Sequence, residues 1–146
     1  MPTAFRYPDK PRRGDAVAVL SPSAGLPARF PLPFDIHAAF TDPDIKAIIA
    51  SIGGEDELKV LAHLDPDLLA ASPKPFFGYS DNTNLHLFLW NLGLVSYLGG
   101  SIMVQFGWPV AMHPVSRQSL ERAMFTRGSY RPLRHRADGD TERTSR

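Results

Sequence analysis

The sequence predicts an α/β fold in which a mainly parallel sheet carries helices on both faces. Short strand-like apolar runs alternate with helix-like runs along the 146 residues, an order typical of parallel sheets covered by helices. Two of the strand-like runs end in small turn residues, at Gly53-Gly54 and at Gly78-Tyr79-Ser80. Because parallel sheets place their sites at the carboxyl ends of strands, these two motifs are expected to face one crevice.

The strands are expected from short apolar runs that turn residues close. The first is a Val/Ala/Leu run followed by a Pro/Ser/Gly turn, and the second is rich in isoleucine and stops at Gly53-Gly54. Two shorter runs follow, "PKPFFGY" and "LVSYLGG". The expected strands lie within residues 15–25, 45–52, 73–79 and 94–100.

The helices are expected from apolar residues at helical spacing and from end signals. Three prolines within residues 27–34 exclude a long helix there, so only one or two turns are expected just after them. Gly93 is placed to end the helix that follows Ser80. The expected helices cover residues 35–40, 55–64, 65–71, 82–92 and 116–125, which together with the strands predict a flavodoxin-like sheet.

The composition describes a soluble globular protein of one common-sized domain. Hydrophobic residues make up 43% and charged residues 21% of the chain, and the formal net charge is +1. This balance gives no basis for nucleic acid or an acidic membrane surface as partner. The absence of cysteine excludes disulfides, thiolate metal sites and a cysteine nucleophile. With no apolar secretory signal and no membrane-length apolar run, the expected location is the cytoplasm.

The last part of the chain differs in character from the rest. Residues 127–146 hold six arginines and only two sizeable apolar residues, Tyr130 and Leu133. Such a segment cannot bury enough apolar surface to order itself. We therefore expect a folded domain over residues 1–128 and a disordered, arginine-rich tail over residues 129–146.

Ser80 lies in "KPFFGYSDNTNLHLFLW", at the joint between a strand-like and a helix-like run. A tight turn there would expose the hydroxyl and aim the free amides of the next helix towards developing negative charge. Gly78 lets the backbone turn closely, and the Asp81 amide is a natural oxyanion donor. The same Ser-Asp-Asn-Thr run is also a common helix cap. The residues alone leave both interpretations open.

The other candidate groups are weaker. Gly53-Gly54 fits an ordinary turn or a loop that brings backbone amides close to a substrate. The five histidines have no zinc-binding spacing, and His86, six residues past Ser80, points away from the turn on a helix. Each is expected to be a surface or packing residue. No phosphate-binding glycine motif is present, which disfavours a nucleotide-binding flavodoxin relative, and no metal or cofactor is expected.

Three segments in order resemble the N-terminal domain of the LD-carboxypeptidase family. They are "GDAVAVLSPSAG", "IKAIIASIGGEDELKVLAHLD" and "PKPFFGYSDNTNLHLFLWNLGLVSYLGG". The family comprises metal-free serine peptidases, including muramoyl-tetrapeptide carboxypeptidases and the microcin C immunity peptidase. The resemblance runs from about residue 14 to residue 128. It implies hydrolysis of an amide bond near a free carboxyl terminus through an acyl-enzyme.

The resemblance assigns roles to four residues. It implies Ser80 as the nucleophile and the amides of Asp81 and Gly54 as the oxyanion hole, with Gly53 on the substrate side. The family's catalytic glutamate and histidine come from a second domain, and no residue here matches them. The ligand implied is a small peptide or a peptidyl-nucleotide, and a homodimer is a possible partner arrangement.

The chain also departs from the family inside this domain. About one helix–strand unit is missing near residues 26–34, so the sheet is expected to be incomplete. Without the base, the chain is expected to be inactive alone. Without the missing unit and the second domain, which would cover apolar surface, it is expected to be marginally stable. The alternative from another class is a non-catalytic relic or a binding module for a peptide or aminoacyl-adenylate ligand.

Overall fold

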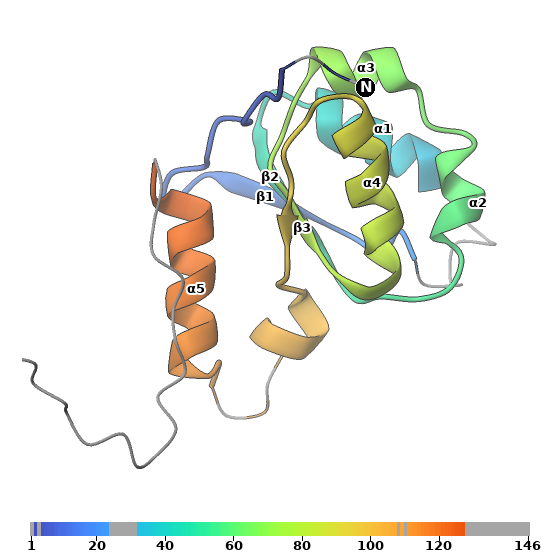
Figure 1. Ribbon diagram of the computed structural model, residues 1–146. Helices are drawn as coiled ribbons and strands as arrows, with labels where there is room; N and C mark the ends of the chain where they lie inside the picture. The colour runs from blue at the N-terminus through green and yellow to red at the C-terminus, as the bar shows by residue number, and fades with distance from the viewer. Residues whose placement is uncertain (1, 3, 24–31, 108, 110, 128–146) are drawn as a thin grey trace, which may run out of the picture.

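The computed structural model describes residues 2, 4–23, 32–107, 109 and 111–127, and it contains a four-stranded parallel sheet (Figure 1). The strands lie side by side in sequence order, and every neighbouring pair is parallel. The predicted mainly parallel α/β fold is therefore confirmed. The strands are β1 (Ala16–Leu20), β2 (Ile45–Ala50), β3 (Phe76–Gly78) and β4 (Tyr97–Leu98).

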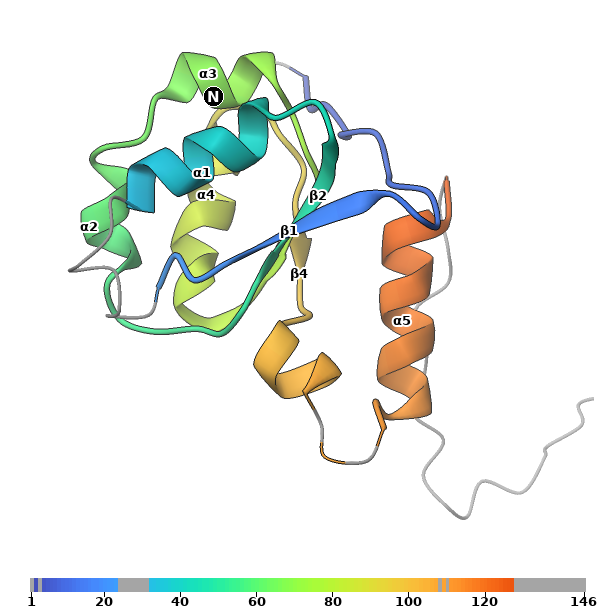
Figure 2. The same ribbon diagram turned by 180° about the vertical axis from the view of Figure 1, so that it is seen from behind.

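The connections between strands place four helices on one face of the sheet. Right-handed crossovers that always step in the same direction return the chain over the same face, and Figures 1 and 2 show these helices on one side and α5 on the other. The elements are α1 (Leu32–Thr41), α2 (Glu57–Leu61), α3 (Pro66–Ala71), the 3₁₀-helix η2 (Ser80–Asn82), α4 (Thr83–Asn91), the π-helix η3 (Ile102–Phe106) and α5 (Pro114–Phe125).

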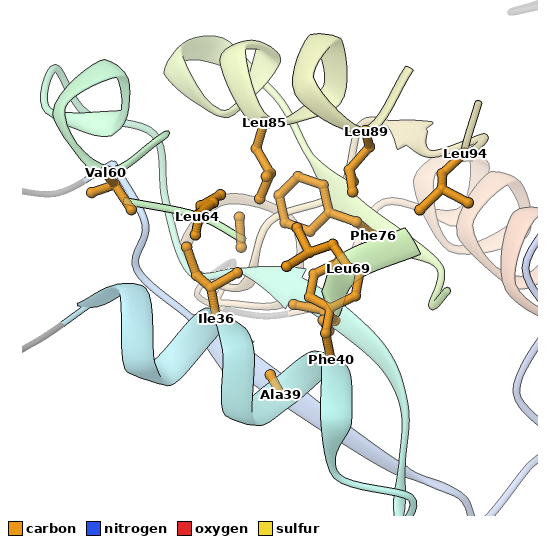
Figure 3. Packing of buried hydrophobic residues seen from close by; sticks show 12 residues of the cluster. Ile36, Ala39, Phe40, Val60, Leu64, Leu69, Phe76, Leu85, Leu89 and Leu94 are labelled. Atoms are coloured by element: carbon orange, nitrogen blue, oxygen red, sulfur yellow. The ribbon is translucent and has the colours of Figure 1, made fainter. Parts of the chain in front are cut away.

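We call the face under α1–α4 the covered face. Ile48 of β2 and Phe76 of β3 point into it, and side chains of the four helices meet there from several directions (Figure 3). Fully buried Phe40 and Phe76 are among its largest members. The buried residues of this core are Ile36, Ala39, Phe40, Ile48, Ala50, Val60, Leu64, Leu69, Phe76, Leu85, Leu89 and Leu94.

We call the other side of the sheet the α5 face. The alternation of side chains along strands sends Ala47, Ile49 and Phe77 to this side, where they meet Met124 of α5. Partly buried residues of β4, η3 and α5 surround them, including Tyr97 and Ile102. Helices therefore cover both faces, as predicted, but the second core is smaller.

Some boundaries differ from those predicted. Helix α1 begins at Leu32, inside the proline-rich segment, because Pro33 falls in its first turn, where a missing amide hydrogen removes no helical bond. Helix α2 spans five residues instead of the ten expected, and η3 was not predicted. The expected unit loss near residues 26–34 lies largely outside the described residues, as does the expected tail at 129–146.

The observed strand order is that of a flavodoxin-like sheet without its second strand. That arrangement has the order 2-1-3-4-5, and removing its second strand leaves strands in plain sequence order, as observed. In the part of the chain that the structure describes, no helix is long and apolar enough to cross a membrane.

Candidate active site

Ser80 lies at a sharp turn between β3 and α4. Strand β3 ends at Gly78, Tyr79 is extended, and Ser80 begins η2, which runs into α4. Its φ of 63° makes it the one non-glycine residue with positive φ in the described part of the chain. This conformation costs an L-residue about 1–2 kcal/mol, and the residue is exposed. The predicted accessible serine at a strand-to-helix turn is confirmed.

Gly53 lies directly against Ser80. A Cβ atom on Gly53 would be 2.8 Å from Ser80 Cβ and 2.9 Å from Ser80 Oγ. Gly53 is absent from the glycines with positive φ, so glycine is required here for space and not for backbone conformation. The Gly-Gly loop thus approaches the serine turn closely, and the predicted meeting of the two motifs at one edge of the sheet is confirmed, while a crevice between them stays a prediction.

The amides around Ser80 divide into two groups. Those of Glu55 and Asp56 donate to the Ser23 carbonyl, at 2.9 and 3.3 Å. The amides of Gly54 and Asp81 make no hydrogen bond to another residue that the structure describes. They stay available as donors beside the serine, and their oxyanion role stays a prediction.

The capping interpretation of Ser80 is not what the structure shows. Neither η2 nor α4 receives a side-chain bond from its own N-cap residue, Tyr79 or Asn82. Asn82 is instead fully buried. It donates to the carbonyls of Ile52 and Tyr79, at 3.1 and 3.0 Å, and accepts from Ser23 Oγ at 3.0 Å. One side chain thereby connects the Gly-Gly loop, the serine turn and the end of β1.

Glu57, at the start of α2, has a fully buried side chain. Burial raises the pKa of Glu57 to about 8, with a smaller contribution from the charge of Asp81, while the bond from the Leu85 amide and the nearby Ser23 hydroxyl act in the opposite direction. Sequence reasoning missed Glu57, Ser23 and Asn82. A first-turn acid and a turn serine look ordinary in sequence, and only burial distinguishes them.

His86 has a structural role. His86 is buried, with Nε2 3.0 Å from the Gly78 carbonyl oxygen and Nδ1 2.6 Å from Ser96 Oγ. Because a carbonyl only accepts, Nε2 carries the hydrogen and Nδ1 accepts from Ser96. Burial lowers the pKa of His86 and keeps it neutral. It is a packing residue, as predicted.

The other ring nitrogens and acids form no metal centre. His37 Nε2 accepts from the Asp65 amide, and His113 Nδ1 accepts from the Val115 amide. Within the described ranges, no group of three or more His, Asp or Glu side chains could hold a metal ion.

Comparison with known families identifies this domain. The model of the LD-carboxypeptidase N-terminal domain matches residues 33–99, which span β2, the Gly-Gly loop, the Ser80 turn and β4. Over these residues the chain is similar to the N-terminal domain of the LD-carboxypeptidase family. The resemblance inferred from the three sequence segments is therefore confirmed.

Curated relatives of the LD-carboxypeptidase domain are longer than this chain. The probable murein peptide carboxypeptidase of Bacillus subtilis is 34% identical over 89 residues, which cover 60% of this chain and 28% of the relative. The microcin C7 self-immunity protein MccF of Escherichia coli is 37% identical over 67 residues, 45% of this chain and 20% of that protein. The chain thus spans less than a third of these relatives.

Solved structures share the fold. The MccF-like protein of Bacillus anthracis matches with a TM-score of 0.73 and 28% identity, covering 82% of this chain and 47% of that one. The muramoyltetrapeptide carboxypeptidase of Oxalobacter formigenes matches with a TM-score of 0.66 and 25% identity, covering 75% and 48%. MccF itself, at 20% identity and a TM-score of 0.71, has been solved with glutamyl sulfamoyl guanosine.

Proposed function

We propose that the chain supplies the nucleophile-bearing half of an LD-carboxypeptidase-type serine hydrolase. The observation that carries the proposal is Ser80 itself: exposed, in a left-handed conformation at a strand-to-helix turn, and pressed against Gly53. Backbone strain of this kind persists where the surrounding structure requires it, and nucleophile turns are one such place. The match of residues 33–99 to the LD-carboxypeptidase N-terminal domain supports the same role.

The proposed reaction uses Ser80 Oγ to attack the carbonyl carbon of an amide bond near a free carboxyl terminus. A base takes the hydroxyl proton and returns it to the leaving amine, and an ester to Ser80 remains until water hydrolyses it. The amides of Asp81 and Gly54 would stabilise the oxyanion. Gly53 would border the substrate, because a side chain there would fill the space beside Ser80 Oγ.

The described residues do not supply the base that this reaction needs. No described histidine or glutamate donates to or accepts from Ser80, and both ring nitrogens of His86 are occupied elsewhere. A triad serine without its base retains about 10³–10⁴-fold over water from binding and the oxyanion hole. We therefore propose that the chain alone works at or near background and needs a glutamate and a histidine from outside these residues.

The proposed ligand is a small peptide or a peptidyl-nucleotide. MccF has been solved with aspartyl sulfamoyl adenosine as well as with the guanosine analogue, and both are aminoacyl groups joined to a nucleoside. The proposed compartment is the cytoplasm; the absence of cysteine is compatible with an oxidising or a reducing compartment. A homodimer is also compatible with the open edge of β1.

A second function, non-catalytic ligand binding, is favoured by one observation. Gly53 and Ser80 lie in contact, while no base contacts the serine within the described residues. Such a site could bind an aminoacyl-nucleotide without cleaving it. Binding of the aminoacyl-sulfamoyl nucleoside by calorimetry, without any covalent modification of Ser80, would favour this function.

The test compares the purified chain with a Ser80→Ala variant. We expect near-background hydrolysis of LD-linked tetrapeptides and aminoacyl-sulfamoyl adenylates by both. We also expect weak labelling of the parent by a fluorophosphonate, which added imidazole increases as an external base, and no labelling of the variant. Labelling that is equal in both would refute Ser80 as the nucleophile. Robust turnover by the parent, lost in Ser80→Ala, would instead reveal a base within the chain, with His113 the first residue to mutate.

A further inference from the structure

Glu57 caps a helix that it does not belong to. Its Oε2 accepts a hydrogen bond from the Leu85 amide at 3.2 Å. Leu85 is the third residue of α4, whose own N-cap residue, Asn82, makes no capping bond. The carboxyl group therefore satisfies one of the free amides that every helix start presents.

Asp81 in turn caps the helix that begins with Glu57. Its Oδ2 accepts from the Glu57 amide at 3.0 Å. Glu57 begins α2, and the side chain of that helix's N-cap residue, Asp56, makes no capping bond. The other Asp81 oxygen accepts from Asn84 Nδ2 at 2.8 Å. The serine turn thus caps the helix after the Gly-Gly loop, and that helix caps the one after the serine turn. We call this pair the crossed caps.

The crossed caps act on the same two segments that Asn82 connects. Asn82 bonds the Ile52 carbonyl, one residue before Gly53, and the Tyr79 carbonyl, one residue before Ser80. The side chains of Glu57, Asp81 and Asn82 therefore fix the separation between the Gly-Gly loop and the serine turn. At this separation Gly53 has no room for a Cβ atom.

The second oxygen of Glu57 indicates which form of the acid the site holds. Glu57 Oε1 is buried and has no hydrogen-bond partner among the described residues. The Ser23 hydroxyl interacts with Glu57, but it already donates its hydrogen to Asn82 Oδ1. A protonated Glu57 could donate to Ser23 and complete the chain of bonds, whereas an ionised one would leave a buried charge unpaired.

We propose that Glu57 is a positioning residue for the oxyanion site, because its crossed caps with Asp81 set the distance between the Gly53 loop and the Ser80 turn. The oxyanion role rests on the proposed function, but the connection between the Gly53 loop and the Ser80 turn does not. Glu57 touches no substrate in this scheme. It acts through the Leu85 amide at one end and through its own amide at the other.

Neutral Glu57 is the form that suits this role. Asp81, on the serine turn, is the charged group that faces it, while Ser23 and Asn82 are its neutral polar neighbours. Burial and the Asp81 charge raise the pKa of Glu57 to about 8. Ionisation above that pH would add a second negative charge beside Asp81 and strain the crossed caps.

The experiment is an NMR titration of backbone amides in the full chain from pH 5.5 to 9.5. We expect the amides of Gly53, Ser80 and Leu85 to shift with one common midpoint near pH 8, as the ionisation of Glu57 moves both segments. The matched variant Glu57→Gln keeps an acceptor for Leu85 and a donor for Ser23 but cannot ionise. It should lose that midpoint at all three amides.

A second variant keeps the test decisive if Glu57→Gln does not fold. Asp81→Asn retains an acceptor for the Glu57 amide but removes the facing charge, so the common midpoint should move to lower pH. A titration seen at Leu85 alone, or a midpoint that persists in Glu57→Gln, would overturn the proposal. These signals need no turnover, so equal fluorophosphonate labelling of parent and Ser80→Ala would refute the proposed function and leave this result standing.

Discussion

The covered face and the α5 face of the sheet differ in how completely helices bury them. On the covered face, four helices enclose Phe40 and Phe76, which are fully buried. Beside the α5 face, Leu98 of β4 and Met103 and Phe106 of η3 remain 72%, 62% and 44% exposed. Large apolar residues grouped on one side of a molecule indicate a surface that another element covers.

The difference explains where the site obtains its rigidity. The crossed caps and Asn82 belong to segments that pack over the covered face, through Leu85 and Val60. Helix η3 also contacts the segment before the Gly-Gly loop, because the Met103 amide donates to the Ser51 carbonyl at 2.9 Å. The site can therefore keep its geometry while the apolar residues beside it remain exposed.

The largest predicted effect contrasts two phenylalanines. Phe76→Ala on the covered face should lower the free energy of unfolding by about 3–5 kcal/mol, because it opens a cavity in a filled core. Phe106→Ala in η3, beside the α5 face, should change it by less than about 1 kcal/mol, because the ring is already partly exposed. Urea denaturation of both variants measures the two values. Similar losses would show that the α5 face is as well packed as the covered face.

The next largest effect is a pH dependence of the free energy of unfolding, caused by Glu57 on the covered face. Since the folded pKa of Glu57, about 8, lies above its ordinary value of 4.5, its contribution to stability is complete below about pH 4.5 and is lost as pH rises through 8. The loss should be of the order of a few kcal/mol. In Glu57→Gln, the difference in unfolding free energy between pH 6 and pH 9 should be much smaller than in the parent. An equally steep slope in the variant would assign the effect to another group.

A smaller effect is expected at the contact between Gly53 and Ser80. Gly53→Ala should cost about 1–3 kcal/mol, because its Cβ would lie 2.8 Å from Ser80 Cβ. Ser80→Gly removes both contacting atoms and the left-handed strain, so it should be neutral or stabilising by up to about 1 kcal/mol. In the double variant most of the Gly53→Ala cost should disappear. Additive losses would mean that the two residues do not touch.

The smallest effect on the folded monomer is expected at the exposed apolar residues of β4 and η3. Leu98→Ser and Met103→Ser should change unfolding stability by about 0.5 kcal/mol or less, but they should reduce self-association. Sedimentation velocity at increasing concentration measures this. We also expect the parent to be marginally stable. A parent that stays monomeric and melts sharply above about 65 °C, the upper end of the mesophile range, would contradict this account of the α5 face.

Sequence reasoning predicted the fold well because the alternation of apolar runs and turn residues is local. The parallel sheet and the positions of Ser80 and Gly53 followed from strand ends alone. Helix α1 was missed in its first turn because prolines count against a helix everywhere except there. The roles of Glu57 and Asn82 depend on burial and on contacts such as Ser23 to Asn82, 59 residues apart in sequence. Such contacts have no local pattern.

The central claim is that the turn presents Ser80 to free amides at the start of a helix. The chain contains no cysteine, so Ser80→Cys introduces a single thiol whose pKa reports on that environment without any base. The measurement is the pH dependence of its alkylation by iodoacetamide, with Ser119→Cys on the exposed surface of α5 as the control. We expect the thiol at position 80 to ionise clearly below the ordinary value of about 8.5 and the control to ionise near it. A thiol at position 80 that ionises at or above the control would contradict the claim.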